Sequence, residues 1–267
     1  MGDHIGEQLG DAELSFRAGQ AQMLAHGAAD LGYCLRECEQ FERERLDHWP
    51  AALLFQRRCE GAAKARRVGI AEYFADAADQ EKLARSIEDW APMIVPGLLQ
   101  TKAYATAITR SAMPRATDTT VGAIVKARLN RAKLFAGASP PKFWAVLDES
   151  VIRRRVLPPV AMAELLEHIV ETVRTTRSIV QIVPETSVTH PFMMGMTRIM
   201  TFLDAPPLVY TEGLHSSQVI DYPALVMDYR ESCDLLRAAA LPPEASLAMI
   251  EAAAEERRNE AQQQRRP

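Results

Sequence analysis

Apolar residues recur at helical spacing in the first segment that carries a clear pattern. Between about Gly69 and Trp90 they follow a period near 3.6, which predicts one amphipathic helix: Ile70, Tyr73, Phe74, Leu83, Ile87 and Trp90. Pro92 and Pro96 end this pattern, because proline cannot continue a helix. Pro96 is followed by glycine, and this dipeptide predicts a turn.

Two further helices are expected before residue 140. Thr101 is a candidate N-cap for a helix over KAYATAITRSA. Asp118 is a candidate N-cap for the next helix, which Gly137 ends. The two helices would be joined by a short connection.

Short runs rich in β-branched and aromatic residues predict strands farther along the chain. They are KFWAVLD, SIVQIVP, MTRIMTFLD and PLVYTEG. A helix from about Pro159 to Thr175 follows the first run, and two helices that begin near Pro223 and Pro243 close the chain. The pattern therefore predicts an α+β fold, with helices around a small, mostly antiparallel sheet.

The junction after KFWAVLD has two interpretations. Asp148 and Glu149 precede an arginine run, Arg153 to Arg155, and two carboxylates facing arginines could perform acid–base chemistry. The simpler interpretation is that Asp148 caps a helix and Glu149 favours its dipole. We expect the structural role.

Charge divides the chain into unequal parts. Residues 1–50 hold ten acidic and four basic residues, a net charge of −6, and a basic segment follows at residues 57–67. We expect a helical region over residues 1–60, an α+β domain over 61–259 and a disordered tail over 260–267.

Composition excludes several classes of protein. No apolar run approaches the length that spans a bilayer, and the acidic N-terminus has no apolar core typical of a signal peptide. We therefore expect a cytoplasmic location and no membrane contact. Four cysteines are too few for a disulfide framework, and although Cys34 and Cys38 lie one helical turn apart, the spacing of zinc ribbons is missing, so no metal is expected.

Polar residues at the end of the last predicted strand form the first candidate site. Tyr210 and Glu212 alternate along the strand, so their side chains point to one sheet face, and His215 follows closely. Such an arrangement could form the floor of a ligand pocket, although an ordinary solvated strand end has the same pattern.

A methionine-rich loop supplies further candidates for ligand binding. His190 and Met194 lie in TSVTHPFMMG, and Trp144 lies in KFWAVLD. Methionine suits adaptable apolar binding surfaces, but it also fills cores, and both interpretations remain open. No nucleotide-binding, hydrolase, metalloprotease or kinase motif occurs, so no cofactor is expected and enzymatic activity is not favoured.

Several segments together resemble one family. They are IVPGLLQTKAYATAI, ARLNRAKLF, WAVLDESVIRRRV, SIVQIVP, PLVYTEG and the closing YRESCDLLRAAALPPEASLAMIEAAAEE, over about residues 71–256. Their order and spacing resemble the C-terminal domain, of unknown function, of actinobacterial XRE-type, antitoxin-like transcriptional regulators. The resemblance implies a domain that senses an effector or a partner, such as a small toxin-like protein. Pro158 and Pro159 stand where the family usually has glycines.

The same resemblance implies a helix-turn-helix within residues 1–60. Leu24-Ala25 and Glu39 keep the family distance, but Ala29-Asp30-Leu31 replaces the usual turn and Gln40-Phe41-Glu42 replaces a glycine and basic residues. Arg36, Arg43 and Arg45 would be the DNA contacts. A net charge of −6 opposes binding to phosphates, so we expect DNA binding to be weakened or lost.

The sequence is compatible with three functions. The first is a homodimeric regulator homologue that senses a small apolar molecule or a protein partner. The second is a regulator fold recruited in secondary metabolism, as a cyclase- or isomerase-type enzyme or as a ligand-binding protein. In the third, residues 1–60 form a dimerisation or docking surface.

Overall fold

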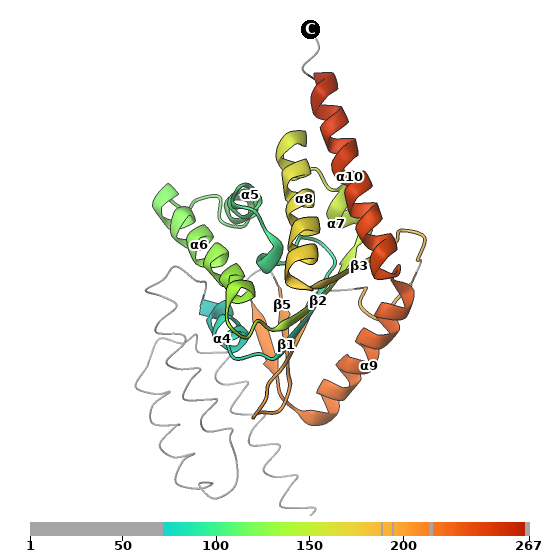
Figure 1. Ribbon diagram of the computed structural model, residues 1–267. Coiled ribbons are helices and arrows are strands. Elements are labelled where there is room, and N and C mark those ends of the chain that lie inside the picture. The colour runs from blue at the N-terminus through green and yellow to red at the C-terminus, as the bar shows by residue number, and fades with distance from the viewer. Residues whose placement is uncertain (1–71, 188, 194, 214–215, 265–267) are drawn as a thin grey trace, which may run out of the picture. The chain divides into compact units, whose positions relative to one another are not determined.

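The computed structural model describes residues 72–187, 189–193, 195–213 and 216–264. All of them belong to one compact unit, Glu60–Pro267. Figure 1 shows this unit as a mixed sheet with helices packed against it.

The centre of the unit is a sheet of six strands in the order β3-β2-β1-β4-β5-β6. The strands are β1 (Ser86–Ala91), β2 (Lys142–Asp148), β3 (Ile179–Val183), β4 (Met196–Thr201), β5 (Leu208–Glu212) and β6 (Ser217–Ile220). β1, β2 and β3 pair in parallel, whereas β4 pairs antiparallel with β1, β5 with β4, and β6 with β5.

Seven α-helices accompany the sheet in the described part of the chain. They are α4 (Glu72–Glu81), α5 (Lys102–Ala112), α6 (Asp118–Arg131), α7 (Glu149–Arg153), α8 (Pro159–Thr176), α9 (Pro223–Ala239) and α10 (Pro243–Gln264), with short 3₁₀ turns at Gly97–Leu99 and Ala132–Ala136. The parallel strands need long crossovers, and α5–α6 and α7–α8 supply them.

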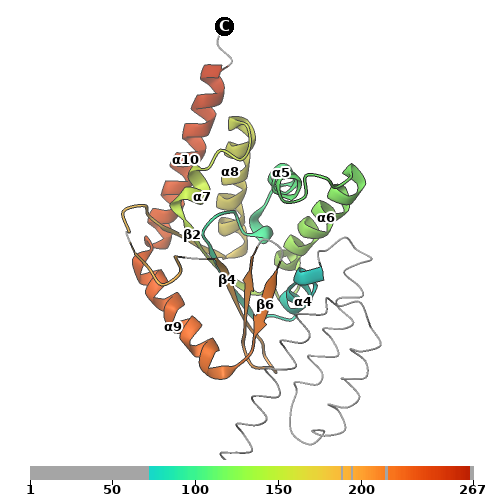
Figure 2. The same cartoon turned by 180° about the vertical axis from the view of Figure 1, so that it is seen from behind.

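Each face of the sheet has its own core. On one face, Ile87, Ala145 and Ile182 pack with residues of α8 and α10, which lie side by side in both views (Figures 1 and 2). On the opposite face, Trp90 and Ile199 pack with residues of α9, such as Leu236. We call these the α8 face and the α9 face.

The predicted α+β class is confirmed, and the arrangement of the sheet differs in part from the prediction. The sheet is mixed, because only three of its five pairings are antiparallel. The four predicted strands correspond to β2, β3, β4 and β5. The short strand β6, with the sequence SQVI, was not predicted.

The predicted helix over residues 69–90 is wrong in its second half. Helix α4 ends at Glu81, and Ser86–Ala91 forms β1 in the middle of the sheet. Ile87 and Trp90 are three residues apart, as on a helix face, yet they enter the cores on opposite faces of the sheet. A strand that is buried on both faces does not alternate between apolar and polar residues. The apolar residues of β1 therefore fell by chance at the spacing expected for a helix.

Helix ends agree with the sequence at some positions and not at others. Thr101 caps α5, and Asp148 caps α7 by accepting a bond of 2.8 Å from the Ser150 amide. Helix α6 is capped by Thr117 rather than by Asp118, which is its first residue. Helix α10 continues through Gln264, beyond the predicted end of the domain at residue 259.

No helix among the described residues is long and apolar enough to cross a membrane.

Candidate functional site

Tyr210 and Glu212 share the α8 face of β5, as their alternation requires. The Tyr210 hydroxyl donates a hydrogen bond of 3.2 Å to Glu212 Oε2. Burial, and then the Glu212 charge, raise the pKa of Tyr210. Tyr210 is fully buried, so its phenol stays protonated and has no exposed surface to offer a ligand.

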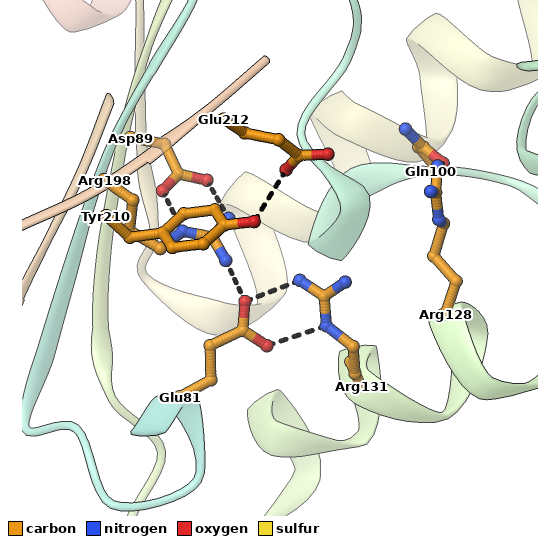
Figure 3. Close-up of polar contacts among 8 residues, drawn as sticks. All are labelled: Glu81, Asp89, Gln100, Arg128, Arg131, Arg198, Tyr210 and Glu212. Carbon is orange, nitrogen blue, oxygen red and sulfur yellow. Dashed lines mark hydrogen bonds and ion pairs between the residues drawn. The ribbon is translucent and has the colours of Figure 1, made fainter. Parts of the chain in front are cut away.

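Beside Tyr210 lies a group of four charged side chains that we call the ion-pair cluster: Glu81, Asp89, Arg131 and Arg198 (Figure 3). Arg198 donates from Nε and from a terminal nitrogen to the two oxygens of Asp89, each at 2.5 Å. Its other terminal nitrogen donates to Glu81. Arg131 donates to both Glu81 oxygens, at 2.7 and 2.5 Å.

Burial and ion pairing together set the protonation states of the four side chains in this cluster. It lowers the pKa of Arg131 and of Arg198 to about 10, so both guanidiniums keep their charge near neutral pH. Burial also raises the pKa of Asp89, and Arg131 opposes that shift. Because both Asp89 oxygens accept from one guanidinium, a geometry that suits a carboxylate, we assign Asp89 as ionised.

The cluster joins four elements of the fold. Glu81 ends α4, Arg131 ends α6, Asp89 lies in β1 and Arg198 lies in β4. Side chains of this length and charge enter a core only when they are paired. All four carboxylate oxygens of Glu81 and Asp89 accept hydrogen bonds within the cluster, which therefore holds α4 and α6 against the sheet.

On the α9 face, an open groove of about 570 Å³ lies where β4 begins and β5 ends. Its floor includes the cross-strand pair Thr197 and Thr211. One wall, which we call the loop wall, includes Pro191–Met193, Gly195 and Met196. The other wall is a face of α9 that carries Leu225, Asp228 and Ser232. Because Trp90, near the end of β1, pairs with Thr197, the groove lies at the carboxyl end of the parallel strands.

Buried contacts position the loop wall of this groove. The Trp90 indole donates a hydrogen bond of 3.1 Å to the Phe192 carbonyl. The His190 ring packs edge-on against Trp90, with ring centroids 5.0 Å apart. Gly195 has φ of +71°, a left-handed conformation that side chains with a Cβ rarely adopt, and it leads the chain into β4.

A family model for a domain of unknown function, DUF5753, matches residues 74–252. The chain belongs to the DUF5753 family. Searches of curated proteins and of solved structures returned no match.

Within the DUF5753 domain, the predicted ligand-binding residues lie on both faces of the sheet. Tyr210 and Glu212 lie on the α8 face, whereas His190 packs on Trp90 in the core of the α9 face. Glu212 also lines the groove at the end of its strand. Met194 and His215 lie outside the described residues, as do Arg36, Arg43 and Arg45, and also Cys34 and Cys38.

Trp144 has a different environment from the groove. Its indole donates to Gln181 Oε1 at 2.8 Å, and the Arg237 guanidinium lies 4.5 Å from the ring centroid. Arg237 in turn pairs with Glu88 and with Asp234. These contacts hold α9 against the sheet, which gives Trp144 a packing role.

Sequence reasoning missed the ion-pair cluster and most of the groove. One signal for the cluster was present, because Arg198 interrupts the apolar run of MTRIMTF and a buried arginine needs carboxylate partners. Its partners Glu81 and Asp89 fell within the segment predicted as one helix, so their positions could not be inferred. In the described part of the chain, no three His, Cys, Asp or Glu side chains are grouped in a way that could hold a metal ion.

Proposed function

We propose that this chain is a homologue of antitoxin-like transcriptional regulators in which the DUF5753 domain senses a small molecule. DNA binding by the N-terminal region is weakened or lost. The observation that carries the proposal is the groove between the loop wall and α9.

The groove has the mixed lining that small-molecule sites use. Apolar side chains from Phe192, Met193 and Leu225 lie next to the hydroxyls of Thr211 and Ser232. The anchored loop wall supports a preformed site, because Trp90 fixes the Phe192 backbone.

Binding to the groove is tested by thermal unfolding of the full chain against a panel of small amphipathic compounds. A compound present at about 100 times its Kd should stabilise the protein by about 2.7 kcal/mol. Leu225→Gln should weaken this response, because it replaces an apolar part of the groove wall with an uncharged polar side chain. Leu203→Gln is the matched control, because Leu203 is 73% exposed in the turn at the far end of β4.

Two outcomes would contradict the sensing role. In one, no compound stabilises the chain. In the other, Leu225→Gln keeps the full response that Leu203→Gln keeps.

The proposed weakening or loss of DNA binding has a separate test. Residues 1–50 carry a net charge of −6, which repels phosphates. A gel-shift assay with the DNA upstream of the protein's own coding region should show no complex, or a weak one at low salt only. A sequence-specific complex that persists at physiological salt would overturn the claim that DNA binding is weakened.

A further inference from the structure

Charge is distributed unevenly around the groove. Its lining includes two carboxylates, Asp228 and Glu212, and no lysine, arginine or histidine among the described residues. Glu212 already accepts a hydrogen bond from Tyr210. Asp228 is exposed on α9, so its carboxylate is the charged group that faces an incoming molecule.

An aromatic pair lines the same groove. The rings of Phe192 and Tyr229 are stacked, with centroids 6.1 Å apart and an interplanar angle of 26°. Tyr229 comes from α9 and Phe192 from the loop wall, so the pair spans the two walls. Phe192 is almost fully buried, so the partly buried ring of Tyr229 and the exposed thioether of Met193 offer most of the apolar surface to a ligand.

We propose that the groove binds an organic ammonium ion with an apolar or aromatic body. The ammonium group lies against Asp228, and the body lies against the Phe192–Tyr229 pair and Met193. Thr211 and Ser232 provide hydroxyls for the remaining polar atoms of the ligand. This inference rests on the proposed sensing function, and it names the ligand class for the same groove.

An anionic ligand is disfavoured by the same observations. It would bring its charge beside Asp228 and Glu212 without a cation in the described lining to compensate, and like charges in an interface oppose binding. A neutral ligand could use the apolar walls, but it would gain no charge attraction from Asp228.

Three probes of one shape separate these possibilities: 4-phenylbutylamine, 4-phenylbutanol and 4-phenylbutanoate. Each is titrated into the full chain at neutral pH and followed by calorimetry. The amine should bind about tenfold more tightly than the alcohol, since a charge-assisted hydrogen bond to Asp228 is added, and the carboxylate should bind more weakly than the alcohol.

Variants of α9 assign the preference to a residue. Asp228→Asn should remove most of the advantage of the amine over the alcohol while leaving the alcohol affinity unchanged. Glu231→Gln removes one negative charge from an exposed position of the same helix outside the groove, and it should keep the preference.

The possible results distinguish the ammonium ligand class from the sensing role of the groove. Equal affinity for all three probes overturns the ammonium class, and an amine preference that survives Asp228→Asn overturns the assignment of the ammonium group to Asp228. If the probes fail while the response to other compounds is weakened by Leu225→Gln, the ligand class is wrong and the sensing groove stands. If no compound binds at all, both are wrong.

Discussion

Arg198 occupies a central position of β4 and exposes 2% of its surface. Moving a guanidinium into a core costs several kcal/mol, and the pairing with Asp89 and Glu81 offsets that cost only while both partners remain. The Coulomb attraction and the hydrogen bonds fix the geometry of four elements at once. The cluster therefore fixes how α4, α6, β1 and β4 pack together, and it contributes little to the net free energy of folding.

Glu81→Gln should destabilise the fold strongly. It removes the negative charge that both Arg131 and Arg198 share, and breaking one partner of a buried pair costs about 3–5 kcal/mol. Glu167→Gln is the matched control, because the pair of Glu167 with Arg258 is exposed and should contribute about 0–1 kcal/mol. Urea unfolding of both variants measures the difference, and equal losses would contradict the structural role of the cluster.

Cys233 should react slowly with thiol reagents in the native protein. Burial in the core of the α9 face raises the pKa of its thiol to about 12, so the reactive thiolate is scarce at pH 8 and stays scarce as pH rises, until it approaches that value. Alkylation followed by peptide mass spectrometry should show rapid labelling of Cys233 only after unfolding in urea. Fast labelling in native buffer at pH 8 would show that the thiol is accessible and ionised.

At the scale of the element, β1 shows why a periodic pattern can mislead. SIEDWA has residues on both faces that must be buried, because the strand lies between β2 and β4 with a core on each side. Asp89 is buried through ion pairing, and no hydrophobicity pattern anticipates that. By contrast, α8 has one apolar stripe and one polar face, and the sequence predicted its start and its end to within one residue.

The cap of α6 is an element-scale prediction that can be measured directly. The Thr117 side chain accepts a hydrogen bond of 3.2 Å from the Thr120 amide, so Thr117→Ala should cost about 1 kcal/mol. Asp118→Ala removes only an exposed ion pair with Arg110 and a favourable helix-dipole contact, which should cost a few tenths of a kcal/mol. Chemical denaturation of the two variants would identify the cap. A larger loss in the free energy of unfolding for Asp118→Ala than for Thr117→Ala would show that Asp118 is the cap.

At the scale of the whole described unit, one sheet separates two different environments. On the α8 face, β4 and β5 carry Arg198 and Tyr210 into the core with the ion-pair cluster, and on the α9 face the same strands carry Thr197 and Thr211 to the groove. The groove and the ion-pair cluster are thus built back to back from neighbouring positions of two strands. Successive side chains of a strand point to opposite faces of the sheet, so the same two strands contribute to the ion-pair cluster on one face and to the groove on the other.

Hydrogen exchange should follow the order of the strands. β1 is hydrogen-bonded on both sides and covered on both faces, so its amides should exchange slowest. β6 is a four-residue strand paired on one side with β5, and it should exchange much faster. Exchange mass spectrometry on the full chain measures both, and equal protection of β6 and β1 would contradict this topology.

The sequence by itself determined the α+β class, four of the six strands, and most helix starts, because these depend on local periodicity, capping residues and prolines. It also indicated that Tyr210 and Glu212 would share a face, since alternation along a strand is local. Only the tertiary structure decided that SIEDWA is a central strand, that Asp89 and Glu81 pair with Arg198, and that the loop wall faces α9 across the groove. Those features depend on which distant segments become neighbours, and the free energy of burial that decides this is a property of the packed whole.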